Sequence, residues 1–290
     1  MSEIKKILVI GGTGFIGSYL VNNLATRPGS QLNVVCYGDL SLENKLPNVN
    51  YHQIDLTKAS DEFNELVDRS DCIVSLATPN SELIKNLIDS VNLAGSKKIV
   101  YTSTLLVYPD SDRVHSEDVK PSPETEYEKN KVEEEKLLTN LAKSGKSKVS
   151  IARLGNVYGN VKNRGLVNHI MLALKNNLPL TINGQGGHRR NYIFVQDVAD
   201  LLEFLIFHDQ QSEIDFYNIC SDVSHTINEV VTEAERISGQ KINKIYGEPI
   251  KEKFSVTGSN KKLTEISGRK PKYDLSSGLQ QAYNNYFKHT

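Results

Sequence analysis

A glycine-rich turn near the start of the chain constrains the fold more than any other feature. The apolar run 6–10 leads directly into Gly11-Gly12-Thr13-Gly14-Phe15-Ile16-Gly17, in which Gly11, Gly14 and Gly17 are spaced three residues apart. Between a strand and a helix, this spacing permits a tight turn, a close approach of backbone to a pyrophosphate, and close helix–strand packing. The free N–H groups of the helix then face the phosphates. The predicted cofactor contacts here are Gly11, Gly14, Phe15, Ile16 and Gly17.

The glycines alone could form an ordinary turn, but the pattern that follows them favours a dinucleotide site. The first half alternates short apolar runs with longer amphipathic segments, as in a parallel sheet covered by helices. Predicted strands are 6–10, 33–37, 51–54, 72–76, 98–102 and 149–154, and predicted helices begin near Phe15 and cover 81–93 and 126–142. In the less regular second half, helices are expected at 197–208 and 228–238 and a strand at 216–220.

This order predicts an α/β fold: a Rossmann doubly wound parallel sheet with a smaller α+β C-terminal cap. The dinucleotide-binding domain is expected to comprise 1–154 plus about 190–221, and the cap about 155–189 plus 222–290. The acidic run 133–135 is expected to lie on the solvent-facing side of its helix.

The second predicted strand leaves the choice between NAD and NADP open, with a preference for NAD. Asp39 follows it and can accept hydrogen bonds from the adenosine ribose, or it can simply cap a turn. Gly38 would leave room for a 2′-phosphate, but no arginine follows to bind one. Asp55, at the end of the third strand, is a candidate partner for the adenine amino group. Leu56 and Ala77, after the third and fourth strands, are assigned to the same cofactor site.

Tyr127 and Lys131 lie four residues apart and therefore share one face of a predicted helix. A phenol normally titrates near pKa ~10, too high for a base at neutral pH. A nearby ammonium, helped by an oxidised nicotinamide, favours the phenolate, so that Tyr127 can exchange a hydroxyl proton while hydride moves. Lys131 can also bind the nicotinamide ribose. Thr104 lies at the carboxyl end of the fifth predicted strand, at the sheet edge where ligands bind, and is expected to hold the reacting oxygen against Tyr127.

Composition favours a small-molecule partner over nucleic acid or a membrane. The net charge is −1 and the pI about 6.7, so no broad attraction to polyanions is expected. The three cysteines are far apart and are expected to be buried thiols in a reducing compartment, and the seven histidines show no metal-ligand spacing. Nothing resembles a signal peptide or a membrane span, so we expect a cytoplasmic protein. Because neither the cysteines nor the histidines have metal-ligand spacing, we expect no metal site.

Together these motifs resemble the extended short-chain dehydrogenase/reductase family, in its NAD-dependent nucleotide-sugar epimerase/dehydratase branch. The matching segments, in family order, are GGTGFIG at 11–17, TSTLLVY at 102–108, YEKNK at 127–131, RLGNVYG at 153–159, RNYIFVQDVADL at 190–201, FYNICSD at 216–222 and KLTEISGRKPK at 262–272. The resemblance implies a nucleotide-sugar-binding cap, with Asn156 and Arg190 on the substrate's diphosphate and Leu166 against its base. It also allows a homodimer.

Departures from the family pattern narrow the reaction that the resemblance implies. Related 4,6-dehydratases carry an Asp-Glu pair after the threonine, where this chain has Leu105-Leu106, which can neither move the C5 proton nor eliminate water. Asn191 and Gly165 also depart from UDP-galactose epimerases. We therefore expect an NAD(P)-dependent oxidoreductase, preferably a 4-ketoreductase of a 4-keto-6-deoxy sugar nucleotide. The alternatives are a nucleotide-sugar 4-epimerase and, less favoured, a non-catalytic NAD(P)-sensing regulator.

Overall fold

The chain forms two compact units in the computed structural model, which describes residues 5–37, 45–78, 80–249 and 253–287. Unit 1 comprises Met1–Val107, Pro123–Arg153 and Ala199–Tyr217, and unit 2 comprises Tyr108–Ser122, Leu154–Val198 and Asn218–Thr290. Compared with the ranges expected from the sequence, residues 108–122, 190–198 and 218–221 belong to unit 2. The binding roles expected of the two parts remain predictions.

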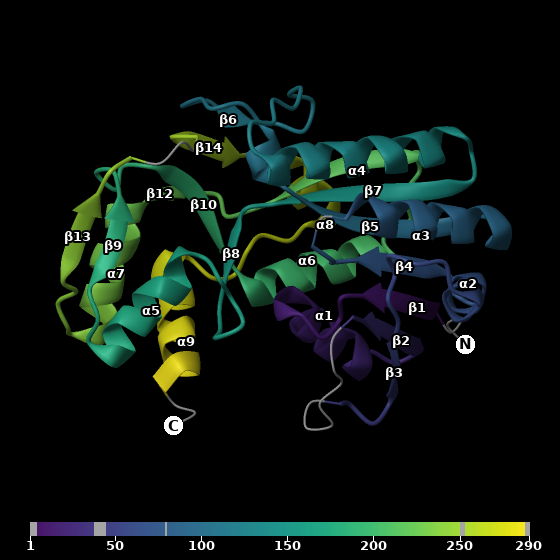
Figure 1. Ribbon diagram of the computed structural model, residues 1–290, viewed down its shortest axis with the longest axis horizontal. Coiled ribbons are helices and arrows are strands. Elements are labelled where there is room, and N and C mark those ends of the chain that lie inside the picture. Colours follow the sequence, from purple (N-terminus) through teal and green to yellow (C-terminus); the bar gives the residue numbers. More distant parts are fainter. Residues whose placement is uncertain (1–4, 38–44, 79, 250–252, 288–290) are drawn as a thin grey trace. The chain divides into compact units, whose positions relative to one another are not determined.

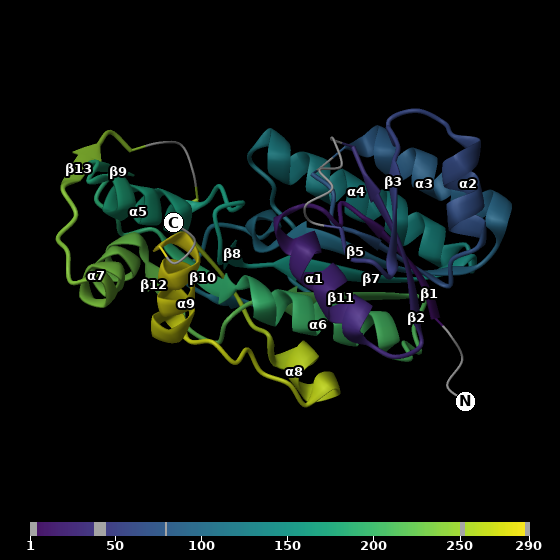
Figure 2. The ribbon, with the colours of Figure 1, turned by 90° about the horizontal axis from the view of Figure 1, so that it is seen from below.

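Unit 1 is built on a seven-stranded sheet with helices on both faces (Figures 1 and 2). Across the sheet the strands are β11 (Ile214–Ile219), β7 (Ser147–Leu154), β5 (Lys97–Thr104), β4 (Cys72–Ser75), β1 (Lys5–Ile10), β2 (Ser30–Cys36) and β3 (Val49–Gln53). The pairs from β3 through β1 to β5 are all parallel. This architecture confirms the predicted Rossmann-type fold.

The helices of unit 1 pack their apolar faces against the sheet, and several of them begin at polar capping residues. α2 (Asp61–Asp68), α3 (Ser81–Ala94) and α4 (Glu126–Lys143) cover one face, and α1 (Phe15–Thr26) and α6 (Val195–Phe207) the other. The Asn80 side chain caps α3 by accepting from two backbone N–H groups, and the Thr125 side chain caps α4 by accepting from one, that of Glu128. α1 and α6 are joined by a hydrogen bond from Asn23 to Asp200 at 2.9 Å.

The strand order brings the segments that carry the predicted site residues to one edge of the sheet. β4 pairs with both β1 and β5, and parallel neighbours end on the same side. The glycine turn after β1, the segment after β4 and the 3₁₀ turn η2 (Leu105–Val107) after β5 therefore all lie at the carboxyl edge. This is the edge at which open α/β sheets bind ligands.

Two of the three acidic residues in the run 133–135 are buried, so their predicted exposure was wrong. Glu134 and Glu135 face the sheet, and only Glu133 is exposed. Glu135 forms a two-point ion pair with Arg153 of β7, with N···O distances of 3.0 and 2.7 Å. Such a pair tolerates burial because both charges are neutralised and hydrogen-bonded.

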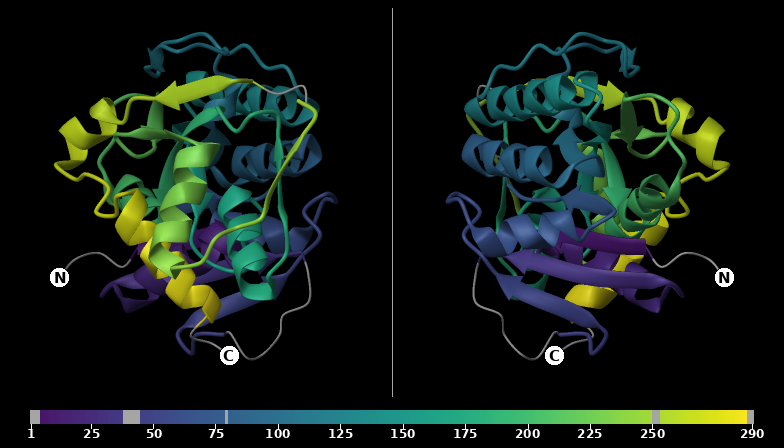
Figure 3. Two further views of the ribbon diagram at one scale, coloured as in Figure 1. Left: turned by 90° about the vertical axis from the view of Figure 1, so that its left-hand side faces the viewer. Right: turned by 90° about the vertical axis from the view of Figure 1, so that its right-hand side faces the viewer.

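The described residues of unit 2 form two small sheets and four helices. One sheet pairs β12 (Ser224–Thr226), β10 (Arg189–Phe194), β14 (Ser255–Gly258) and β6 (Val114–His115), with β8 (Asn156–Tyr158) also on β10; the other pairs β9 (Leu180–Asn183) with β13 (Lys244–Gly247). The helices are α5 (Leu166–Asn176), α7 (Ile227–Ser238), α8 (Lys261–Ser267) and α9 (Leu275–Phe287). α5, α7 and α9 pack together (Figure 3).

The three cysteines are free and buried, as predicted. No helix among the residues that the structure describes has the length and apolar character to cross a membrane.

Removing one partner of the Arg153–Glu135 pair should destabilise unit 1 strongly. We expect Arg153→Met to reduce the free energy of unfolding by about 3–5 kcal/mol, because it leaves a buried carboxylate unpaired. Urea unfolding followed by circular dichroism measures the change. The double variant Arg153→Met/Glu135→Leu should recover most of the loss, and Lys129→Met, in an exposed pair with Glu126, should have no measurable effect. An Arg153→Met protein as stable as the wild type would contradict the assignment.

Candidate active site

The glycine turn brings the first turn of α1 against the end of β1. Gly11 has a φ of +79°, which favours glycine, and its carbonyl accepts from the Gly14 N–H at 3.0 Å. A Cβ at Gly17 would lie 2.6 Å from the Gly12 Cα and closer still to the Gly11 oxygen. Glycine is therefore required here, and the N–H groups of Phe15, Ile16 and Gly17 at the start of α1 point out of the turn.

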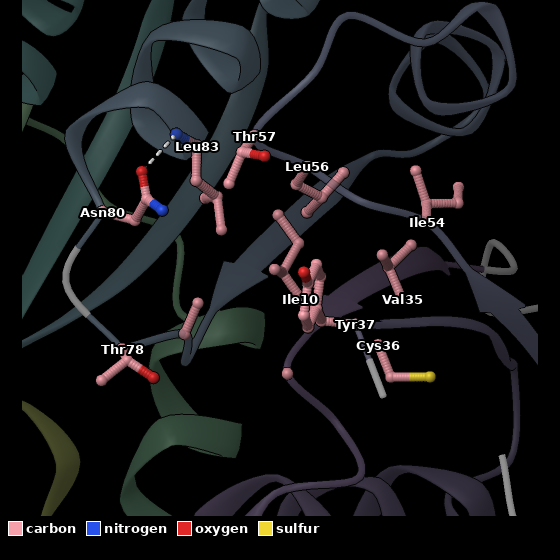
Figure 4. A pocket seen from close by; sticks show the side chains of 12 residues that line it. Ile10, Val35, Cys36, Tyr37, Ile54, Leu56, Thr57, Thr78, Asn80 and Leu83 are labelled. Atoms are coloured by element: carbon pink, nitrogen blue, oxygen red, sulfur yellow. Dashed lines mark hydrogen bonds between the residues drawn. The ribbon is translucent and has the colours of Figure 1, made fainter. Parts of the chain in front are cut away.

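A cavity of about 400 Å³ opens beside this turn (Figure 4). Its floor is apolar and comes from the ends of β1 and β2, with Ile10 and Val35, and from the segment after β3, with Leu56. Gly11, Ala77, Thr78 and Asn80 line its other side. Of the residues predicted to contact the cofactor, Gly11, Leu56 and Ala77 thus line one cavity.

The two acidic residues predicted for the adenosine have different outcomes. Asp39 lies outside the described residues. The Asp55 carboxylate accepts from the Thr57 N–H at 3.1 Å and from the Thr57 hydroxyl at 2.6 Å, and Lys58 lies 3.4 Å away. These hydrogen bonds from Thr57 lower the pKa of Asp55. The carboxylate is committed to a local turn, and its contact with adenine remains a prediction.

The Thr104 hydroxyl lies close enough to the Tyr127 phenol to lower its pKa. Thr104 ends β5, and its oxygen also accepts from the Leu106 N–H at 3.2 Å. Thr104 is buried, whereas Tyr127, in the first turn of α4, is 44% exposed. The two hydroxyls predicted to hold one substrate oxygen are therefore brought together, with the phenol on the open side.

Lys131 is buried and directed toward β5. Its Nζ donates to the Tyr101 hydroxyl at 2.8 Å and to the Thr102 carbonyl at 2.9 Å, and a carboxylate oxygen of Glu134 lies 3.6 Å away. An ammonium has three N–H donors, so these two hydrogen bonds leave one for a ligand. Burial lowers the pKa of Lys131 to about 8, and the neighbouring carboxylate of Glu134 opposes that change.

The expected lowering of the Tyr127 pKa by Lys131 is not found. Partial burial raises the pKa of Tyr127, the Glu134 charge adds to that rise, and the hydrogen bond from Thr104 opposes it. The reason is local, because the Lys131 charge lies beside Glu134 and its N–H groups point to β5. Tyr127 is therefore protonated at neutral pH in this structure.

Tyr101 and Glu134 belong to this site but were missed in the sequence. Tyr101 is in the middle of a buried strand and resembles a core aromatic, and Glu134 lies in an acidic run. The available signal was helical spacing, since Glu134 follows Lys131 by three residues and so shares its face.

The three residues predicted to bind the substrate's diphosphate and base lie in unit 2. Asn156 begins β8, opposite Tyr192 of β10, and Leu166 is the first residue of α5. Arg190 of β10 is buried, and its guanidinium donates to the backbone carbonyls of Arg189, Lys253 and Phe254. These contacts hold the β10–β14 edge together, and binding of a diphosphate by Arg190 remains a prediction.

The unit 1 site has the form that a dinucleotide requires. Its cradle is a positive-φ glycine turn with no room for a Cβ at Gly17, followed by the free amides of a helix and an apolar cavity. On the far side of the cavity, the backbone N–H of Asn80 donates to the carboxylate of Glu134, which follows Lys131 by three residues. The cavity and the Tyr127–Lys131 face of α4 are thus connected within one unit.

Comparison with known proteins agrees with this geometry. The model of the NAD dependent epimerase/dehydratase family matches residues 7–220. The chain is 26% identical to dTDP-4-dehydro-6-deoxyglucose reductase of Escherichia coli over 79% of this chain and 80% of that protein. It is also 26% identical to UDP-glucuronic acid decarboxylase 5 of Arabidopsis thaliana over 94% of this chain and 87% of that one.

The fold is shared with a solved UDP-glucuronic acid 4-epimerase from Bacillus cereus, in complex with UDP-glucuronic acid and NAD. The TM-score is 0.90 at 20% identity, covering 98% of this chain and 100% of that one.

The Gly17 contact gives a direct test of the cofactor cradle. We expect Gly17→Ala to weaken NAD(H) binding at least about tenfold, because the new Cβ meets backbone atoms that cannot move without opening the turn. Fluorescence titration with NADH measures the affinity. Gly247→Ala is the matched control, since its nearest neighbour would be 3.8 Å away. Equal affinity of the Gly17→Ala and Gly247→Ala proteins would contradict this assignment.

Proposed function

The chain belongs to the NAD dependent epimerase/dehydratase family, and on that premise we propose that it reduces the 4-keto group of a 4-keto-6-deoxy sugar nucleotide with NAD(P)H. The observation that carries the proposal is the Thr104–Tyr127 hydroxyl pair followed at once by Leu105-Leu106 in η2. The pair can deliver one proton to one oxygen. Two leucines cannot remove a C5 proton or expel water, so dehydration is disfavoured.

The chemistry divides between the cofactor and the side chains of unit 1. The nicotinamide, when bound, supplies the hydride. Thr104 binds and orients the ketone oxygen, and Tyr127 gives its phenolic proton to that oxygen as it becomes an alkoxide. Reduction must begin with Tyr127 protonated, which fits a pKa that burial raises. Lys131 holds the nicotinamide ribose with its remaining N–H, while the neighbouring Glu134 carboxylate balances its charge.

The nucleotide-sugar substrate is proposed on the resemblance and on the relatives. The similarity to the E. coli dTDP-4-dehydro-6-deoxyglucose reductase, over about four-fifths of each chain, supports a 4-keto-6-deoxy sugar nucleotide. Asn156, Leu166 and Arg190 are the proposed contacts to its diphosphate and base, all from unit 2. NAD is preferred over NADP as the starting assignment, with Asp39 as the proposed ribose acceptor.

Cofactor stoichiometry tests the reaction. Purified protein is incubated with NADH or NADPH and a UDP- or dTDP-linked 4-keto-6-deoxy sugar, and nicotinamide absorbance and sugar product are followed together. We expect one reduced nicotinamide to be consumed for each sugar reduced. Tightly bound NAD⁺ released on denaturation, with interconversion of 4-epimers and no net consumption, would assign a 4-epimerase instead. The same three residues serve that reaction.

Replacing the proton donor should abolish turnover without preventing cofactor binding. We expect Tyr127→Phe to lower kcat by about 10²–10⁴-fold, because the alkoxide then has no positioned acid. NADH affinity should be unchanged. Tyr246→Phe is a matched control, since Tyr246 is 47% exposed against 44% for Tyr127. Full activity of the Tyr127→Phe protein would reject the proposed acid, and binding without turnover in the wild type would favour a regulatory role.

A further inference from the structure

Glu134 is the most buried charged side chain near the candidate site, at 1% exposure, and both of its carboxylate oxygens are used. Oε1 accepts from the backbone N–H of Asn80 at 2.6 Å. Oε2 accepts from the Tyr101 hydroxyl and lies 3.6 Å from the Lys131 Nζ. One carboxylate of α4 thus contacts the turn before α3, the strand β5 and its own helix.

Tyr101 is the bridge between this carboxylate and Lys131. Its hydroxyl accepts from the Lys131 Nζ at 2.8 Å and donates to Glu134, so the three groups form a closed triangle. The Thr102 carbonyl takes a second N–H of Lys131 at 2.9 Å. The orientation of the ammonium, and hence of its third N–H, is therefore fixed from two sides.

We propose that Glu134 is a positioning residue of the active site: through Tyr101 it fixes the direction and the charge of Lys131, and through Asn80 it ties Lys131 to the cofactor cavity. The inference rests on the proposed function, because it assigns Lys131 the task of holding the cofactor ribose. Asn80 lines the cavity and caps α3, so Glu134 joins the cofactor-binding wall to the catalytic helix.

The charges around Lys131 explain why this position carries a carboxylate. Tyr101 on β5, and Tyr127, Glu134 and Glu135 on α4, are the titratable groups around it. Glu135 is paired at two points with Arg153 of β7. Glu134 is therefore the unshared carboxylate that balances the buried ammonium, and a neutral residue there would leave only the charge of Glu135, which is shared with Arg153.

The sign of the effect on pH dependence follows from this geometry. Burial lowers the pKa of Lys131 to about 8, and the Glu134 charge raises it against that burial. Lys131 is active when protonated, so activity falls as pH rises through its pKa. Removing the Glu134 charge lowers the pKa further, and the alkaline fall then moves to lower pH.

The test compares Glu134→Gln with Glu133→Gln, the exposed neighbour on the same helix. Two profiles are measured against pH: kcat/KM for the sugar nucleotide, and NADH affinity by fluorescence. In Glu134→Gln we expect the alkaline limb of both profiles to move down by about one pH unit or more, and activity at pH 8 to fall about tenfold or more. Glu133→Gln should follow the wild type.

Tyr101→Phe keeps the carboxylate and its bond to Asn80 but removes the bridge. We expect weaker NADH binding and a lower kcat, with a smaller pH shift than in Glu134→Gln. Circular dichroism melts of all variants separate this effect from lost stability. A Glu134→Gln protein that melts earlier but keeps the wild-type pH profiles would overturn the proposal. So would one that matches the wild type throughout.

The two proposals fail in distinguishable ways. A shifted pH profile of NADH affinity in Glu134→Gln, without turnover of any sugar nucleotide by the wild type, supports the role of Glu134 and rejects the proposed reaction. Turnover of the 4-keto sugar with unshifted profiles in Glu134→Gln supports the reaction and rejects the role of Glu134.

Discussion

The backbone contact between the first turn of α1 and the end of β1 determines where everything else in unit 1 lies. Because Gly17 has no Cβ, α1 can start directly against Gly11 and Gly12. The free amides of α1 therefore lie at the carboxyl edge of the sheet. β4 and β5 follow β1 across the sheet, and their ends reach the same edge. Residues a hundred positions later in the chain, such as Thr104, are thereby placed at a site that begins with three glycines.

The elements that could be predicted are those whose own residues determine them. The central strands are continuous apolar runs because both faces are covered; β4 was expected at 72–76 and is Cys72–Ser75. The three-residue strands β8 and β12 were not predicted, because they exist only through pairing with β10. Thr104, Tyr127 and Lys131 were predicted by motif as candidate catalytic residues, and the structure places Thr104 close enough to Tyr127 to affect its pKa.

Electrostatics accounts for what could not be predicted. A run of three glutamates indicates a solvent-facing surface, since an unpaired buried carboxylate is unfavourable. The free-energy cost of burying Glu134 and Glu135 is offset by contacts with Tyr101, Lys131 and Arg153. Tyr101 and Arg153 come from the strands β5 and β7, outside the helix that carries the two glutamates. Asp55 shows the opposite case. Its nearest partner, Thr57, is two residues away and holds the carboxylate in a local turn, while its contact with adenine remains a prediction.

The different exposures of Lys131 and Tyr127 bear on which reaction the site suits. Lys131 is buried and held by fixed neighbours, so its charge stays in place through a catalytic cycle. Tyr127 is 44% exposed, and Thr104 lies close enough to lower its pKa. A reductase consumes one proton from its acid in every turnover, whereas an epimerase returns the proton that it takes. A phenol that water can reach is reprotonated directly, without a relay through the protein, and this arrangement fits a reaction with net proton consumption.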